Sequence, residues 1–138
     1  MNTGTDTGFF VELLRGNPNA TEGWENLIHG EDQGVCSALT LFEIERLGLK
    51  GSITREATSS LTEAIPAVCR MTWIENRKIV ADAARLSHGL GLPAVDALIL
   101  AGFVQKGVEI IYTTDKHLEA YKAKGVRTVN LAGITRRR

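Results

Sequence analysis

The stretch GLPAVDALILAGFVQKGVEIIYTTDKHL, residues 91–118, decides the fold of this chain. Pro93 suits the first position of a helix and Gly107 can adopt the left-handed conformation that ends one, so a helix is predicted from about Pro93 to Lys106. This helix is apolar on nearly every side, which is typical of a helix packed inside a fold. Residues 108–112 then have the β-branched content of a short buried strand. The stretch therefore predicts a buried helix that leads directly into a buried strand.

Two carboxylates stand out in this apolar stretch. Asp96 is the lone charge in the middle of the helix, and burial of an unpaired carboxylate costs several kcal/mol, roughly. Asp96 is therefore expected to be paired, to bind a metal, or to lie beside a water-filled cleft. Asp115 follows the strand at its carboxyl end, which is where open parallel sheets bind their ligands. Both side chains can face the same cleft.

Outward from this stretch, short strands alternate with helices along the chain. The strands are expected at residues 2–5, 35–36, 71–74, 108–112 and 126–131, with helices in the segments between them and at residues 116–124. Ser37 is expected to cap one helix, which Gly48 closes, and Ser52 the next, which Pro66 interrupts. This alternation predicts an α/β fold in which helices cover both faces of a parallel sheet. The first strand is the weakest of these predictions, because NTGT lacks the Val and Ile of a buried parallel strand.

Size and composition restrict the class of protein. The chain has 138 residues with 43% hydrophobic content, which predicts a single domain over residues 1–138. Its formal net charge of +0 excludes a globally basic nucleic-acid binder, although a local patch such as Arg136–Arg138 is still possible. The sequence has neither a run of about 18 apolar residues nor the features of a signal peptide, so a soluble, cytoplasmic protein is expected. Cys36 and Cys69 have no metal-binding spacing and are expected to be reduced core thiols.

Four acids fall at positions that a fold of this kind would bring together. They are Asp6 after the first strand, Glu43 within a helix, Asp96 and Asp115. Glu45 flanks the other edge of the same helix, and helical geometry alone does not choose between Glu43 and Glu45. Two carboxylates about 4 Å apart repel by roughly 4 kcal/mol at an effective dielectric constant near 20, so a cluster of four requires a cation.

The type of ligand indicates which cation. Hard oxygen ligands without Cys or paired His favour Mg²⁺ or Mn²⁺ over zinc, and such a site suits phosphodiester hydrolysis. Thr7 and Thr114 stand beside two of the acids and could donate hydrogen bonds to a carboxylate or a phosphate. His117 is expected at the surface, with substrate contact as the less favoured alternative.

Four segments together resemble the PIN domain family, in particular its VapC-like ribonuclease toxins of prokaryotic toxin–antitoxin pairs. These segments are DTGFF, TLFEI, PAVDALILA and YTTDKHL, which begin at residues 6, 40, 93 and 112. The resemblance implies an α/β/α sandwich, an acidic quartet that binds Mg²⁺ or Mn²⁺, and metal-dependent cleavage of RNA. Carried over by position, the quartet falls on Asp6, Glu43, Asp96 and Asp115. The match to TLFEI therefore favours Glu43 over Glu45 as the helix acid.

The resemblance also implies protein partners. It leads us to expect a homodimer, and an antitoxin whose helix lies in an apolar groove near the site. Leu13, Trp24 and the helix around Leu61 are the candidate surfaces for that groove.

Other interpretations compete with the nuclease. Asp96 and Asp115 could be ordinary helix-capping or first-turn acids. A non-catalytic PIN-like module for RNA binding or assembly would keep the fold, but its site should lack at least one acid. A phospho-accepting receiver domain needs an acid pair after the first strand, whereas Asp6 is followed by Thr7.

Overall fold

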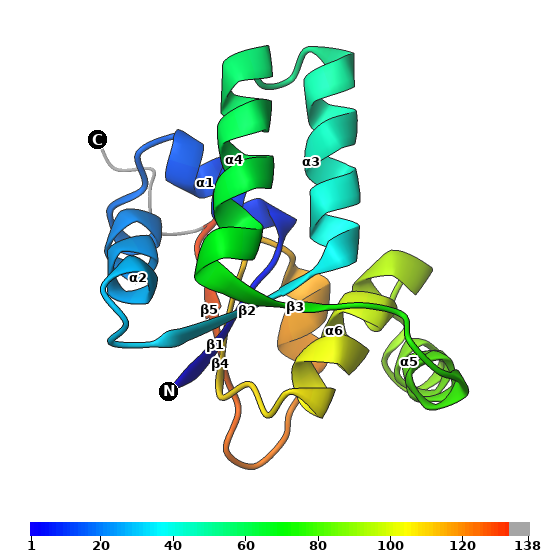
Figure 1. The fold of residues 1–138 in the computed structure, drawn as a ribbon. Coiled ribbons are helices and arrows are strands. Elements are labelled where there is room, and N and C mark those ends of the chain that lie inside the picture. The colour runs from blue at the N-terminus through cyan, green and yellow to red at the C-terminus, as the bar shows by residue number, and fades with distance from the viewer. Residues whose placement is uncertain (133–138) are drawn as a thin grey trace.

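Five parallel strands form the centre of the molecule in a computed structural model that describes residues 1–132 (Figure 1). The strands are β1 (Asn2–Thr5), β2 (Gln33–Ser37), β3 (Cys69–Thr72), β4 (Ile110–Thr113) and β5 (Arg127–Asn130). Their order across the sheet is β3-β2-β1-β4-β5. This order differs from the 2-1-3-4-5 order of flavodoxin-like domains, so a receiver domain is excluded. The basic residues Arg136–Arg138 lie outside the described part of the chain.

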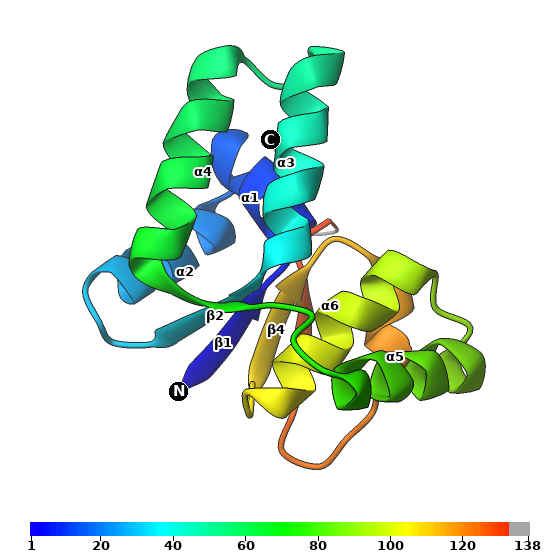
Figure 2. The ribbon, with the colours of Figure 1, turned by 45° about the vertical axis from the view of Figure 1, so that its right-hand side comes forward.

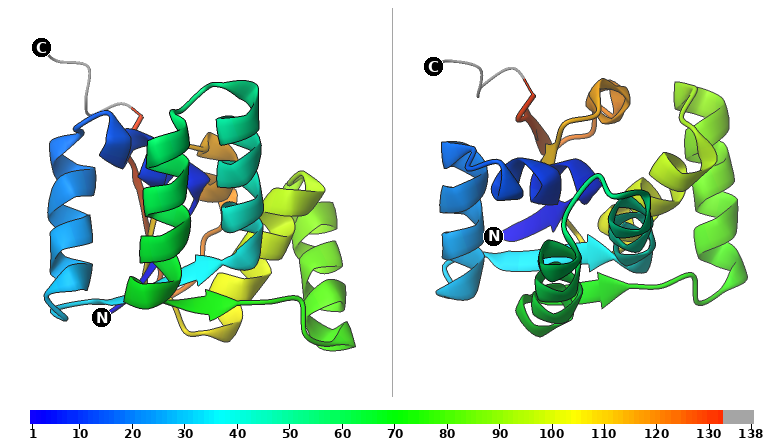
Figure 3. Two further views of the ribbon diagram at one scale, coloured as in Figure 1. Left: turned by 45° about the horizontal axis from the view of Figure 1, so that its top comes forward. Right: turned by 90° about the horizontal axis from the view of Figure 1, so that it is seen from above.

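Helices cover both faces of this sheet, as the alternation of elements predicts. They are α1 (Thr7–Leu14), α2 (Pro18–Ile28), α3 (Ala38–Lys50), α4 (Arg55–Val68), α5 (Arg77–Leu90), α6 (Ala94–Gln105) and the short 3-10 helix η1 (Lys116–Ala120). The pair α5 and α6 lies on the opposite side of the sheet from α1 and α2 (Figure 2). The pair α3 and α4 runs antiparallel and reaches past the sheet (Figure 3). The α/β/α sandwich is confirmed.

Helix α6 supplies more buried residues to one core than any other element does. Leu100 and Phe103 are fully buried, and they pack with residues of β2, β4 and α5. Phe9, Phe10 and residues of α2, α3 and α4 form the second core on the other face. The sheet therefore lies between two apolar cores, and neither core covers the edge at which the strands have their carboxyl ends.

The polar strand NTGT is the central strand, which its composition predicted only weakly. Thr3 and Thr5 are buried, and their β-branched side chains suit a strand. Gly4 faces α6, where an added Cβ would lie 3.0 Å from the ring of Phe103. The strand therefore has a glycine and not an apolar side chain on that face, which allows α6 to lie close to the sheet.

The predicted end of α3 at Gly48 was wrong, because the helix continues one turn further to Lys50. Gly51 ends it in the left-handed conformation with a φ of +79°. Gly48 lies inside the helix, where a Cβ would come within 2.3 Å of the Thr58 hydroxyl oxygen. Gly48 therefore serves the close packing of α3 on α4 and does not end the helix.

Four further boundaries also differ from the prediction. The N-cap of α4 is Thr54, whose hydroxyl accepts from the Ala57 N–H, and Ser52 does not cap it. The helix passes through Pro66 and ends two residues later, at Val68. The third strand occupies residues 69–72 and not 71–74. The helix predicted over residues 116–124 is only the short η1.

Two further observations concern the cysteines and the helix lengths. Cys36 and Cys69 are free and buried, and burial raises the pKa of the Cys69 thiol to about 11. In residues 1–132, no single helix is long and apolar enough to cross a membrane. The pair α5 and α6 has the necessary length and composition only when taken together, with a bend of 119° between the two helices.

Candidate metal centre

A pocket of about 270 Å³ opens at the carboxyl edge of the sheet, where β1 and β4 end side by side. Its lining includes all four acids and both threonines expected from the sequence: Asp6, Thr7, Glu43, Asp96, Thr114 and Asp115. These residues come from α1, α3, α6 and the segments that follow β1 and β4. The fold therefore brings together side chains that are up to 109 residues apart in the chain.

Asp6 is the most buried of the four acids, with 6% of its surface exposed. It is the N-cap of α1, and its Oδ1 accepts a hydrogen bond of 3.0 Å from the Phe9 N–H. Its Oδ2 accepts from the hydroxyl of Thr113 at the end of β4. Burial raises the pKa of Asp6 to about 6, because desolvation and the nearby carboxylates of Asp115 and Glu43 outweigh these hydrogen bonds.

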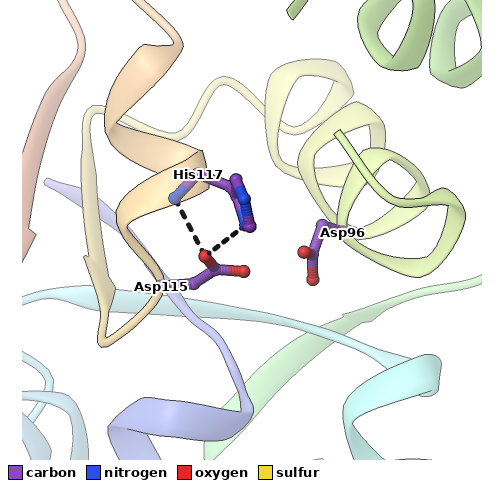
Figure 4. A group of neighbouring side chains, drawn as sticks. All are labelled: Asp96, Asp115 and His117. Carbon is purple, nitrogen blue, oxygen red and sulfur yellow. Dashed lines mark hydrogen bonds and ion pairs between the residues drawn. The ribbon is translucent and has the colours of Figure 1, made fainter. Parts of the chain in front are cut away.

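Asp96 and Asp115 face each other across the pocket, from the first turn of α6 and from the start of η1 (Figure 4). Burial and, to a lesser extent, the adjacent Asp115 together raise the pKa of Asp96 to about 7. Partial burial opposes ionisation of Asp115 as well. However, hydrogen bonds from the Asp96 carboxyl and the His117 N–H hold the pKa of Asp115 below its ordinary value. The pKa values of the two neighbouring carboxyls are therefore shifted in opposite directions.

His117 joins these two acids from η1. Its N–H donates to Asp115 Oδ1 over 2.8 Å, and its Nδ1 lies 3.0 Å from the same oxygen. One ligand atom from each of Asp96, Asp115 and His117 lies within 4.8 Å of the others. His117 is exposed, as the sequence predicts, but it belongs to the acidic cluster.

The two acids of α3 have different surroundings. Glu43 lines the pocket, and its Oε1 accepts a hydrogen bond from the Thr7 hydroxyl. Glu45 is exposed and lines a separate hollow between α3 and α4, together with Arg55. The structure thus places Glu43 with the other three acids and Glu45 on the other side of the helix.

Gly8 allows the two sides of the pocket to approach closely. A Cβ at Gly8 would lie 1.9 Å from the Thr114 hydroxyl oxygen and 3.0 Å from the Thr114 backbone nitrogen. Any side chain at this position would push the segment between β4 and η1 away from α1. Gly8 therefore keeps Asp115 near Asp6.

Three contributors to the pocket were missed from the sequence. Thr113 precedes the predicted Thr114, and its hydroxyl both donates to Asp6 and accepts from the Asp115 N–H over 2.8 Å. Arg46 and Lys50 line the pocket from α3. Their spacing of three and seven residues from Glu43 is the signal that could have found them, because it puts them on the same side of the helix.

The set of donor atoms fits a hard divalent cation. Carboxylate oxygens predominate, and they suit Mg²⁺ and Mn²⁺, while His117 adds a single imidazole nitrogen. Burial is the main cause of the raised pKa values of Asp6 and Asp96, and the neighbouring carboxylates add to it. A bound cation would remove the repulsion among these carboxylates, so the residues present fit a metal site.

The fold and the pocket define a parallel α/β protein with a candidate divalent-metal site at the carboxyl edge of its sheet. The model of the PIN domain matches residues 5–124, and the chain belongs to this family. No curated protein matches the chain.

Solved structures of similar fold cover nearly the whole chain. A toxin–antitoxin complex from Klebsiella pneumoniae is 19% identical, covers 94% of this chain and 97% of its own, and has a TM-score of 0.70. VapBC-1 from nontypeable Haemophilus influenzae is 16% identical over 96% of this chain and 99% of its own, with a TM-score of 0.65. FitAcB from Neisseria gonorrhoeae is 23% identical over 94% and 98%, with a TM-score of 0.64. At these identities, the likeness shows a common fold.

Proposed function

We propose that this chain, as one PIN-like domain over residues 1–138, is a metal-dependent endoribonuclease that hydrolyses RNA phosphodiester bonds. The observation that carries the proposal is the single pocket lined by Asp6, Glu43, Asp96 and Asp115. Four acids that repel one another are costly to keep together unless a cation binds them. Membership of the PIN domain family supports the nuclease class.

In this proposal the four acids hold Mg²⁺ or Mn²⁺, and the neighbouring hydroxyls fix their positions. When bound, the cation lowers the pKa of a water and offsets negative charge on the phosphate. Thr113 orients Asp6, and Thr7 orients Glu43, through the hydrogen bonds that their hydroxyls donate. Thr114 faces the pocket and is available to donate to the substrate phosphate.

We also propose that the chain is the toxin of a toxin–antitoxin pair, acts in the cytoplasm and forms a homodimer. This role is supported by the similar structures, several of which are toxin–antitoxin complexes. The antitoxin would place a helix in an apolar groove near the site. Leu13, Trp24 and the helix around Leu61 are still the candidates for that groove, although Leu61 itself is 6% exposed and packs in the core.

The test is to replace Asp96 by Asn and to measure RNA cleavage with Mg²⁺ or Mn²⁺. Loss of a metal ligand should reduce kcat by on the order of a thousandfold, which corresponds to about 4 kcal/mol of transition-state free energy. The matched control is Asp82→Asn, because Asp82 lies on the exposed side of α5 in ion pairs with Lys78 and Arg85. Undiminished cleavage by Asp96→Asn would contradict the proposal.

A second pair of variants tests the helix acid. Glu43→Gln should lose cleavage and Glu45→Gln should retain it, because only Glu43 lines the pocket. If calorimetry detects no binding of Mg²⁺ or Mn²⁺ to the unmodified chain, the alternative of a non-catalytic PIN-like module for RNA binding or assembly is favoured instead.

A further inference from the structure

Two cations stand beside the acids on the same side of α3. Arg46 and Lys50 line the pocket together with Glu43, at spacings of three and seven residues from it. Such spacings put side chains on one face of a helix. With a rise of 1.5 Å per residue, Arg46 lies about 4.5 Å and Lys50 about 10.5 Å along the axis from Glu43. The charges on this face therefore run from negative at the pocket to positive along α3.

These two cations have no partner among the side chains of residues 1–132. Neither Arg46 nor Lys50 forms an ion pair or a side-chain hydrogen bond there, whereas Arg15, Lys78 and Arg85 all pair with acids. Both side chains are exposed. The buried apolar residue of this part of the helix is Ile44, which packs in the core. Both cations are therefore free to bind an external anion.

The pocket itself accommodates only a small part of a polymer. A volume of about 270 Å³ is at the lower end of the range for small-ligand sites, so the substrate chain must continue outside it. An acid-lined pocket repels the further phosphates of such a chain, while cations at its rim attract them. Arg46 and Lys50 are the cations that line this pocket along α3.

We propose that Arg46 and Lys50 bind the phosphates that flank the scissile phosphate on one side, so that the substrate strand lies along α3. This inference rests on the proposed nuclease function. It makes Arg46 and Lys50 substrate-binding residues, and it predicts that the enzyme prefers an extended strand to a dinucleotide.

The first experiment compares the steady-state kinetics of Arg46→Gln, Lys50→Gln and the double variant on a single-stranded RNA. The matched control is Arg55→Gln, which removes an exposed cation from the hollow on the other side of α3. The double variant should have a KM about tenfold higher at low salt, with little change in kcat, because the contacts that it loses are to phosphates that do not react. On a dinucleotide, which has only the scissile phosphate, it should match the unmodified protein.

The second experiment measures binding of a fluorescent single-stranded RNA as a function of salt, in the Asp96→Asn background so that the RNA is not cut. Each lost phosphate contact should reduce the slope of log K against log salt by about 0.7. Arg46→Lys should keep the slope of the unmodified protein, because it keeps the charge.

The outcomes separate the two proposals. An unchanged salt slope in the double variant, an equal loss on the dinucleotide, or an equal loss in Arg55→Gln would overturn the phosphate track. A protein that cuts no RNA but loses salt-dependent binding in the double variant would contradict the nuclease and retain the track.

Discussion

Each end of α1 buries a carboxylate that accepts two side-chain or backbone hydrogen bonds, but the charged groups beside the two carboxylates have opposite signs. Glu12, near the carboxyl end, is 3% exposed and accepts hydrogen bonds from Arg15 Nη1 over 3.0 Å and from Asn17 Nδ2 over 3.3 Å. Asp6, at the amino end, is 6% exposed, and the charged groups that shift its pKa are the carboxylates of Asp115 and Glu43.

This difference separates an acid whose charge is matched within the fold from an acid of the proposed metal site. Both carboxylates have hydrogen-bond donors within the protein, but only Glu12 also forms an ion pair, with Arg15. A buried carboxylate placed among other acids adds repulsion to the folded state, and it becomes favourable only when a ligand supplies positive charge. Burial alone would not have distinguished these two residues.

The largest expected effect comes from exchanging each carboxylate for its amide. Asp6→Asn should reduce RNA cleavage by on the order of a thousandfold, or about 4 kcal/mol, because it removes a metal ligand while Asn still caps α1. Glu12→Gln should leave cleavage nearly unchanged, because Glu12 lies at the other end of the helix. An equal loss of cleavage in Asp6→Asn and Glu12→Gln would contradict the distinction between the two carboxylates.

The pH dependence of stability gives the next largest effect. The pKa of Asp6 rises from 3.8 to about 6 on folding, so between these pH values the folded state keeps a proton that the unfolded state has released. The free energy of unfolding of the metal-free protein should therefore fall as the pH rises from about 4 to about 6, with about 3 kcal/mol due to Asp6.

Urea denaturation in the presence of a chelator at several pH values measures this contribution. Asp6→Asn should lack it, so the stability of the variant relative to the unmodified protein should increase over the same pH range. Glu12→Gln should keep it. A constant difference between Asp6→Asn and the unmodified protein across this range would show that Asp6 ionises normally.

The sequence predicts that an acid lies in the pocket where local order along the chain determines its position. Asp6 and Asp115 follow buried strands, and the carboxyl ends of neighbouring parallel strands meet at one edge. Asp96 is recognisable because it is the lone charge of an apolar helix. For these three acids, local patterns and the topology of the sheet were sufficient.

Other features depend on packing that no local pattern reveals. Glu43 and Glu45 are equivalent until the inward face of α3 is known, and only the family resemblance preferred Glu43. Gly48 and Gly51 are both possible helix ends, and the contact of Gly48 with Thr58 decides between them. A role for Arg46 and Lys50 likewise cannot be inferred until the position of α3 beside the acids is known.

The smallest expected effect tests which donor satisfies Glu12. Arg15 is 64% exposed on its side chain, so its ion pair with Glu12 is strongly screened by water, and Arg15→Ala should cost less than about 1 kcal/mol of unfolding free energy. Glu12→Ala should cost more, about 2 kcal/mol, because it leaves a cavity and deprives the buried Asn17 amide of one of its two acceptors, the other being the Leu131 carbonyl. Thermal unfolding of both variants with saturating Mn²⁺ measures the difference. If Arg15→Ala proves the more costly change, the main partner of Glu12 is the exposed Arg15 guanidinium and not the buried Asn17 amide. The two ends of α1 would then differ only in that Glu12 has a cation beside it and Asp6 does not.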